Sequence, residues 1–325
     1  MNMGIKDIPF PCIAPIASSM GIRLAGIPAE EAIHNPETQA EALSVFLERF
    51  PDIDIATPVM DTSVEARTLG CPWEFKGRVP VITGHICTDA DAVDRLRIPD
   101  PDDAPPMQVG IKAVKNLTRL TNKPVAAFVV GPVTVAAHLM GLPALIRAAL
   151  KDAPGFARIL DRCAAVITPY AKALTQAGAQ AIIMLEPQIM AFPPAVFTNS
   201  IRTHIDGIAS QLPSPIMHVC GDTSRLCRAF AGTEHLFGLS LDAPVDFRKS
   251  LDETPLLKAK TLIGNIDPVG VMLKGTPGMV REKVLSLVLA MKGERFILST
   301  GCDLPPEIPA ENLDAFIEAA LSLRG

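Results

Sequence analysis

The stretch IMHVCGD, residues 216–222, is an apolar run of strand length that ends in polar residues. Side chains at positions i and i+2 of a strand point to the same face, so His218 and Cys220 share one side. Imidazole nitrogen and thiolate sulfur are ligands that Zn²⁺ binds at about 2.0–2.3 Å. The spacing alone also fits a buried His and Cys that only pack in the core. The motifs elsewhere in the chain favour metal ligation.

Seven further apolar runs of similar length predict a parallel sheet, because most are continuous rather than alternating, as in strands covered on both faces. The eight runs cover residues 12–17, 53–59, 125–130, 181–185, 216–220, 236–241, 261–266 and 296–300, and helical spacing follows over residues 194–211, 224–231, 277–292 and 310–323. This alternation predicts an α/β fold, a (β/α)₈ TIM barrel with a single domain over residues 1–325. The segment 89–106, rich in Asp and Pro, is interpreted as an insertion after an early strand, the second one.

Composition excludes several function classes. The formal net charge is -5, Lys and Arg are dispersed, and 5% of the residues are aromatic, so no nucleic-acid-binding surface is indicated. No apolar run reaches the length of a membrane span, and residues 1–10 lack the apolar region of a signal peptide. The seven cysteines are then expected as thiols or metal ligands. We expect a cytoplasmic protein with no nucleic-acid or membrane partner.

A TIM barrel places its chemistry at the carboxyl ends of the strands. Five consecutive predicted strands end there in ligand-type or hydrogen-bonding residues, namely Glu186, the pair His218 and Cys220, Asp242, the pair Asn265 and Asp267, and Cys302. Cys302 is the candidate for a third metal ligand, and three protein ligands with one open position are typical of a catalytic zinc site. For Asp267, which precedes a proline, helix capping is the preferred interpretation.

Several motifs together resemble one family. HVCGDT (218–223), LSLD (239–242), GNIDP (264–268), GTP (275–277), GCDLPP (301–306) and PAEN (309–312) are similar to the zinc methyltransferases of the uroporphyrinogen decarboxylase superfamily, the methylcobamide:coenzyme M methyltransferases and their corrinoid-dependent relatives. GPVT (131–134) and AGA (177–179) also look like the family. The resemblance covers residues 124–325 well and the first third more loosely. It implies a (β/α)₈ barrel and a zinc ion bound by His218, Cys220 and Cys302.

The resemblance also implies a reaction. A zinc-bound thiolate, such as that of coenzyme M, would attack the methyl group of a methylcobamide that a transient corrinoid-protein partner carries. Glu186, Asp242 and Asn265 would lie around the zinc, either supporting its ligands or contacting substrate. Glu186 could also occupy the open zinc position before substrate arrives.

Other activities of the superfamily stay open. Related corrinoid-linked demethylation systems use tetrahydrofolate or another methyl acceptor. Uroporphyrinogen decarboxylases of porphyrin biosynthesis bind an acidic substrate with an Arg-rich N-terminal loop. Residues 11–23, the corresponding stretch of this chain, contain a single arginine, Arg23. The first third of the chain therefore leaves the acceptor open.

Two further interpretations concern the cysteines. His85 and Cys87 repeat the H-x-C spacing and rival the metal pair, but they lack the following Gly-Asp-Thr turn. A zinc-dependent sensor with Cys220, Cys227 and Cys302 as redox-sensitive thiols is the alternative from a different class. Cys12, Cys71, Cys87 and Cys163 are expected to be structural by default, and for Cys227, inside a predicted helix, packing is preferred to ligation.

Overall fold

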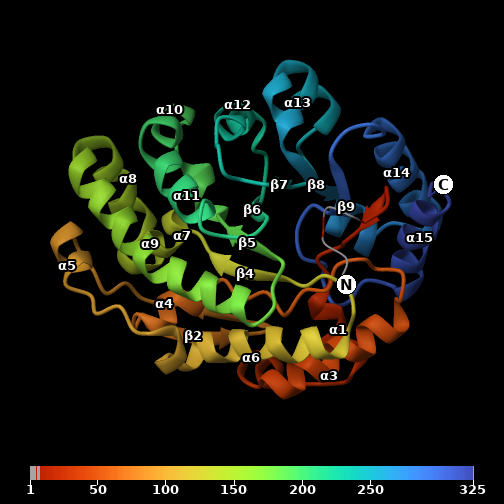
Figure 1. The fold of residues 1–325 in the computed structure, drawn as a ribbon, viewed down its shortest axis with the longest axis horizontal. Helices are drawn as coiled ribbons and strands as arrows, with labels where there is room; N and C mark the ends of the chain where they lie inside the picture. The colour runs from red at the N-terminus through yellow and green to blue at the C-terminus, as the bar shows by residue number, and fades with distance from the viewer. Residues whose placement is uncertain (1–4, 6–7, 325) are drawn as a thin grey trace.

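The computed structural model describes residue 5 and residues 8–324, which form a curled parallel sheet with helices packed around it (Figure 1). The seven-stranded sheet has the order β1-β9-β8-β7-β6-β5-β4, and β2 and β3 form a separate hairpin. The strands are β1 (Cys12–Ile13), β2 (Trp73–Lys76), β3 (Val79–Ile82), β4 (Ala126–Val130), β5 (Ala181–Leu185), β6 (Pro215–Val219), β7 (Gly238–Leu241), β8 (Thr261–Ile266) and β9 (Phe296–Thr300). This arrangement confirms the predicted barrel.

The helices lie mostly between successive strands, as the predicted alternation requires. They are α1 (Ser18–Leu24), α2 (Ala29–His34), α3 (Pro36–Arg49), α4 (Val64–Thr68), α5 (Ala90–Asp94), α6 (Pro105–Leu120), α7 (Pro132–Met140), α8 (Leu142–Lys151), α9 (Ala153–Gln176), α10 (Pro194–Val196), α11 (Arg202–Ala209), α12 (Cys227–Ala231), α13 (Phe247–Glu253), α14 (Pro277–Ala290) and α15 (Ala310–Leu321). Two π-helices also occur, η4 (Phe197–Ile201) between α10 and α11, and η7 (Pro268–Leu273) after β8. The expected helix over residues 194–211 is therefore interrupted. Among the described residues no single helix is long and apolar enough to cross a membrane, although α7 and α8, bent by 113°, satisfy the length and composition requirement as a pair.

The predicted second strand, residues 53–59, closes the barrel but is much shorter than expected. It contributes one isolated bridge, between Ala56 and Val125, and its Asp54 N–H donates to Ile13 O at 2.8 Å. These contacts place the segment between β4 and β1. It leaves the sheet near Pro58, which has no N–H to donate to a ladder.

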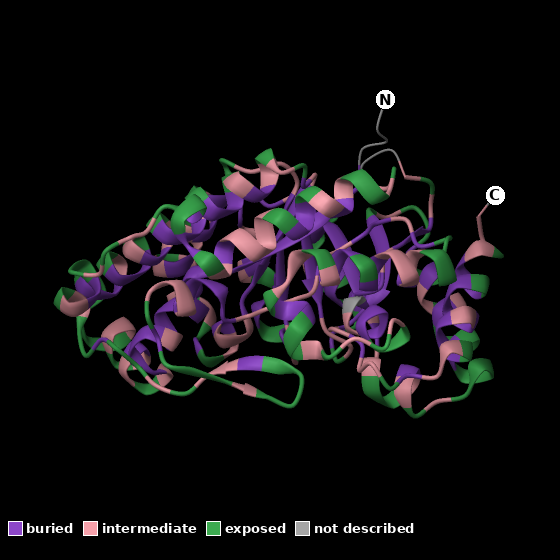
Figure 2. Cartoon of the chain, turned by 90° about the horizontal axis from the view of Figure 1, so that it is seen from below, coloured by how far each residue is buried: buried purple, intermediate pink, exposed green. Residues whose placement is uncertain are grey.

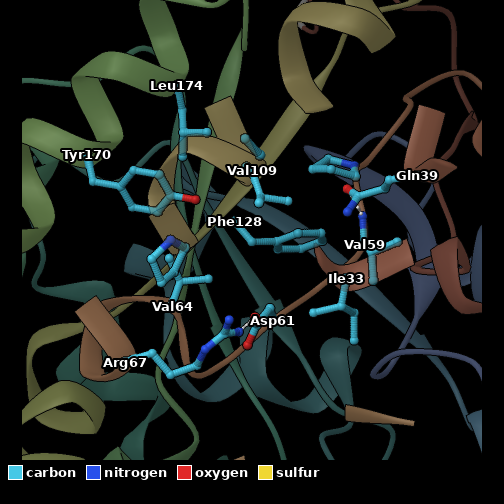
Figure 3. Close-up of a pocket in the computed structure, with 14 residues that line it drawn as sticks. Ile33, Gln39, Val59, Asp61, Val64, Arg67, Val109, Phe128, Tyr170 and Leu174 are labelled. Atoms are coloured by element: carbon cyan, nitrogen blue, oxygen red, sulfur yellow. Dashed lines mark hydrogen bonds and ion pairs between the residues drawn. The ribbon is translucent and has the colours of Figure 1, made fainter. Parts of the chain in front are cut away.

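A small cavity lies where this segment separates from β4 (Figure 3). Its volume is about 40 Å³, room for a few water molecules. The buried ion pair of Arg67 and Asp61, at 2.9 Å, and the Tyr170 side chain line it. Glu65 compensates for part of the missing ladder, because its Oε1 accepts from Val130 N at 2.8 Å. None of the predicted metal ligands lines this cavity.

The insertion after the second strand is present and begins earlier than predicted. Besides α5 and a short 3₁₀ helix within residues 89–106, it contains α4 and the β2–β3 hairpin. β2 is mostly exposed whereas β3 is partly buried, and at the turn of the hairpin Arg78 pairs with Glu307 at 2.7 Å. Sequence reasoning missed the hairpin because each strand has only four residues, WEFK carries two charges and VPVI contains Pro80, which counts against a strand.

Figure 2 shows buried residues through the middle of the molecule and exposed residues on its outer surface. The buried apolar residues form two main groups, one inside the barrel and one between the sheet and its helices. Alternate strand residues such as Ile183, Ile216, Ile263 and Ile297 fill the barrel interior. Their neighbours in sequence pack against the helices. This double burial explains why the strand sequences are apolar throughout, and it leaves the polar residues at the strand ends.

Candidate metal centre

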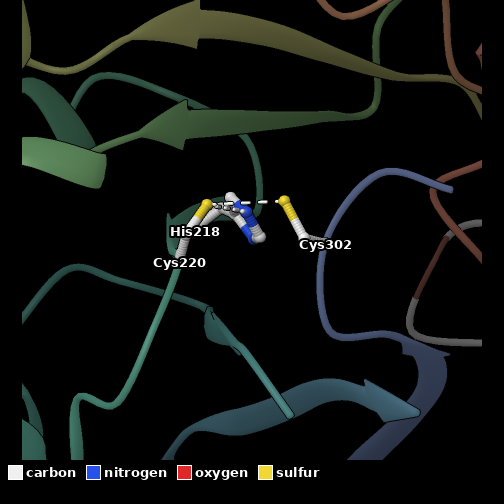
Figure 4. Close-up of side chains that lie close together, drawn as sticks. All are labelled: His218, Cys220 and Cys302. Carbon is white, nitrogen blue, oxygen red and sulfur yellow. Dashed lines mark hydrogen bonds between the residues drawn. The ribbon is translucent and has the colours of Figure 1, made fainter. Parts of the chain in front are cut away.

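Three ligand-type side chains converge at the carboxyl ends of β6 and β9 (Figure 4). The Cys220 sulfur lies 3.3 Å from His218 Nε2 and 3.4 Å from the Cys302 sulfur. All three ligand atoms lie within 4.8 Å of one another. The structure thus brings together the three residues that sequence analysis selected as metal ligands, although Cys220 and Cys302 are 82 positions apart.

The side chain of His218 has a fixed orientation. It is 1% exposed, and its Nδ1 lies 2.9 Å from the Ser240 hydroxyl oxygen on the neighbouring strand β7. Sheet register explains this contact, because His218 and Ser240 are paired residues of β6 and β7. With Nδ1 engaged by the hydroxyl, Nε2 faces the two sulfur atoms. Sequence reasoning missed Ser240, although its position two residues before Asp242 is a signal for the same face of the strand.

The donor set and its spacing fit a zinc ion. Tetrahedral coordination with Zn–S of about 2.3 Å and Zn–N of about 2.0 Å separates two sulfurs by about 3.8 Å and a sulfur from a nitrogen by about 3.5 Å. The separations of 3.4 Å and 3.3 Å are close to these edges. The hydrogen bond from Cys302 lowers the pKa of Cys220, which favours a thiolate there. One tetrahedral position remains for a further ligand.

Asp242 and Asn265 lie at the ends of the two strands between β6 and β9, and both are engaged by the backbone. Asp242 accepts from Gly221 N through Oδ2 and from Ala243 N through Oδ1, each at 2.7 Å. Asn265 donates from Nδ2 to Asp242 O at 3.1 Å and to Val245 O at 2.6 Å. These contacts place both residues beside the ligand loops.

Glu186 is fully buried and accepts hydrogen bonds from the first turn of α7. Its Oε1 accepts from Val133 N at 3.0 Å, and its Oε2 accepts from Thr134 N at 3.0 Å and from the Thr134 hydroxyl at 2.7 Å. Burial raises its pKa to about 7, and the bonds from Thr134 and Val133 partly oppose this shift. Gly131 provides the space, since a Cβ there would lie 2.3 Å from Glu186 Cδ. In this conformation the carboxylate satisfies helix N–H groups, and its predicted place in the open zinc position stays a prediction.

Two more carboxylates follow the last two strands of the chain, Asp267 after β8 and Asp303 after β9. Asp267 caps η7, because its Oδ1 accepts from Val269 N and Gly270 N, which confirms the capping interpretation. Asp303, next to Cys302, was not selected from the sequence. Its Oδ2 accepts from the Ser19 hydroxyl at 2.7 Å, and burial raises its pKa to about 6.

The rival pair lies elsewhere, in the insertion. His85 Nδ1 contacts His138 O at 2.9 Å, and Cys87 is buried. Among the described residues these two do not belong to a group of three potential ligands. Cys12, Cys71 and Cys163 are also buried, and burial raises the pKa of each, as expected of structural cysteines.

The fold and the site together describe a (β/α)₈ barrel with a candidate His-Cys-Cys metal centre at the carboxyl ends of its strands. The chain belongs to the uroporphyrinogen decarboxylase family, whose profile, described as uroporphyrinogen decarboxylase (URO-D), matches residues 6–323.

Both methyltransferases and decarboxylases are among the relatives. The methylcobamide:CoM methyltransferase MtbA of Methanosarcina mazei is 26% identical over 277 residues, which are 81% of this chain and 78% of the relative. A uroporphyrinogen decarboxylase of Streptomyces avermitilis is 28% identical over 312 residues, 90% of this chain and 83% of the relative. A solved methyltransferase from Methanosarcina mazei has the same fold, with a TM-score of 0.85 at 20% identity, covering 98% of this chain and 96% of that one.

Proposed function

We propose that this protein is a zinc-dependent methyltransferase that moves a methyl group between a methylated corrinoid, carried by a transient partner protein, and a thiol such as coenzyme M. The convergence of His218, Cys220 and Cys302 supports the proposal most directly. The name of the relative MtbA, a methylcobamide:CoM methyltransferase, supports the corrinoid and the thiol.

The residues of the chain have separate tasks in this proposal. His218, oriented by Ser240, would supply a neutral nitrogen ligand, and Cys220 and Cys302 would supply two thiolates. A bound Zn²⁺ would favour the deprotonated form of the substrate thiol at neutral pH. The chain leaves one tetrahedral position for that thiol. A reducing cytoplasm, the location we propose, would keep both cysteines reduced and free to bind metal.

Metal analysis combined with a methyl-transfer assay tests the proposal. Purified protein is incubated with methylcobalamin together with one acceptor at a time. The acceptors are coenzyme M, other thiols and tetrahydrofolate. We expect bound zinc and a spectral change from methylcob(III)alamin to cob(I)alamin with a thiol. Turnover with tetrahydrofolate alone would favour a corrinoid-linked demethylation system instead.

Uroporphyrinogen decarboxylation is the second candidate, because the Streptomyces avermitilis decarboxylase is 28% identical over most of the chain. The N-terminal loop supports it poorly. Its Arg23 donates from Nη1 to Pro306 O at 2.7 Å, and this single guanidinium would neutralise few carboxylates of an acidic porphyrinogen. Consumption of uroporphyrinogen, with no methyl transfer to any acceptor, would establish the decarboxylase.

A further inference from the structure

The two cysteine ligands lie in loops that follow β6 and β9, and these strands are not neighbours in the sheet. In the sheet order β9-β8-β7-β6, two strands lie between the strand that carries His218 and the strand that precedes Cys302. Backbone hydrogen bonds between adjacent strands do not reach directly across this gap. The separation of the two sulfurs therefore depends on what lies between the loops that carry them.

Asp242, at the end of β7, lies between these two loops. On one side its Oδ2 accepts from the N–H of Gly221, the residue after Cys220, at 2.7 Å. On the other side it packs against Gly301, the residue before Cys302, so closely that a Cβ on Gly301 would lie 2.5 Å from Asp242 Oδ1. A single carboxylate thus contacts the immediate neighbour of each cysteine ligand.

The backbone of Asp242 is itself held in place. Asn265, at the end of β8, donates to Asp242 O at 3.1 Å and to Val245 O at 2.6 Å. Gly301 N donates to Ile266 O at 2.8 Å, which fixes the second loop against β8. The intervening strands β7 and β8 therefore form a connected series of contacts from the Cys220 loop to the Cys302 loop.

We propose that Asp242 is a positioning residue that sets the separation of the Cys220 and Cys302 sulfurs for metal binding. The inference rests on the metal site of the proposed function, but not on methyl transfer. Both carboxylate oxygens already accept backbone N–H groups, so Asp242 acts through the loops and is not a metal ligand. A carboxylate is required because both of its oxygens accept, whereas an amide would direct one NH₂ group at a backbone N–H.

The test measures metal binding by Asp242→Ala and Asp242→Asn proteins. Zinc affinity is measured by competition with a chelator, and Co²⁺ absorption reports the coordination geometry. We expect both variants to bind zinc about 10–100-fold more weakly, as when partners that orient metal ligands are removed, and to change the Co²⁺ spectrum. Asp267→Ala, which removes a comparable backbone cap at the end of β8, is the matched control and should keep both properties.

Gly301→Ala tests the same contact without removing the carboxylate. The added methyl group would lie 2.5 Å from Asp242 Oδ1 and 2.6 Å from Ala243 N, so the Cys302 loop must shift and zinc binding should weaken. Gly278→Ala is its control, because the nearest atom would be 3.8 Å away. If an Asp242 variant does not fold, Gly301→Ala decides the question.

Two outcomes would overturn the inference. In the first, the Asp242 and Gly301 variants keep the zinc affinity and the Co²⁺ spectrum of the unaltered protein. In the second, the unaltered protein itself binds no zinc. An unaltered protein that binds zinc but transfers no methyl group would contradict the proposed function alone. The two proposals can therefore fail separately.

Discussion

At the scale of single residues, the strand ends carry both the three candidate metal ligands and the residues that orient them. His218 is oriented by Ser240, and the loops of the two cysteines are joined through Asp242. Glu65 and Glu186 both accept hydrogen bonds from the backbone of residues 130–134. Buried carboxylates therefore hold the backbone where β4 ends and α7 begins.

Replacing Cys302 with Ala should abolish most zinc binding, because two remaining ligands hold the metal much more weakly than three. The unaltered protein should contain about one zinc per chain, measured by atomic emission on purified protein. His85→Ala is the control and should retain zinc. The opposite pattern, with zinc kept in Cys302→Ala and lost in His85→Ala, would assign the metal to the other H-x-C pair.

Glu65 should make folding stability depend on pH. Burial raises its pKa to about 8 in the folded protein, whereas an unfolded Glu titrates near 4.3. Between these values the folded state binds the additional proton, so stability falls as pH rises, by at most about 1.4 kcal/mol per pH unit. Glu65→Gln, whose amide oxygen can still accept from Val130 N, should weaken this fall.

Urea unfolding of both proteins between pH 5 and 9 measures the effect. Glu186, whose pKa burial raises to about 7, should leave part of the pH dependence in the Glu65→Gln protein. Glu41→Gln, at an exposed position, serves as the control. An unchanged pH profile in Glu65→Gln would contradict the assignment.

At the scale of elements, the least regular part of the barrel is the segment that closes it. Residues 53–57 contribute one bridge to β4 and a backbone bond to β1, rather than full ladders. Asp54 strengthens the closure, because its Oδ2 accepts from Ile13 N at 2.7 Å and pairs with Arg324. One side chain thus links the first strand, the closing segment and the chain just after the last helix.

Asp54→Ala should destabilise the fold by about 1–3 kcal/mol, because the Ile13 N–H and the Arg324 guanidinium lose a partly buried acceptor. Urea unfolding gives the free-energy difference. Asp52→Ala, at an exposed position two residues earlier, should change stability little. Equal stability of the two variants would show that the backbone contacts alone close the barrel.

At the scale of the whole molecule, the candidate metal centre lies at the carboxyl ends of the barrel strands. The two main groups of buried residues extend through the barrel interior and the surrounding helix layer, and they contain none of the three ligands. Three protein ligands contribute less to folding than a closed site with four. The barrel and the metal centre should therefore be separable by experiment.

Removing the metal with a chelator should leave the helical circular dichroism signal nearly unchanged while zinc-dependent activity is lost. Re-addition of zinc should restore activity, which excludes irreversible damage as the cause. Collapse of the helical signal on chelation would instead assign a structural role to the metal.

The sequence by itself determined the barrel class and the three candidate ligands. Continuous apolar runs identify strands buried on both faces, and the i, i+2 spacing of His218 and Cys220 places them on one side of a strand. These two properties are local to one element, whereas the choice of Cys302 rested on its place after the last predicted strand and on the family motifs. The capping role of Asp267 was also predictable, because it involves the next three residues.

Only the tertiary structure decided how residues far apart in sequence meet. Glu186 contacts residues more than fifty positions upstream, and Asp242 lies between Gly221 and Gly301. Both arrangements depend on strand order and on how the sheet closes. The pairing of residues 54 and 56 with β1 and Val125 likewise depends on how the sheet closes. The physical reason is that side-chain period reports which face a residue occupies, whereas distances across a barrel depend on the packing of all its strands.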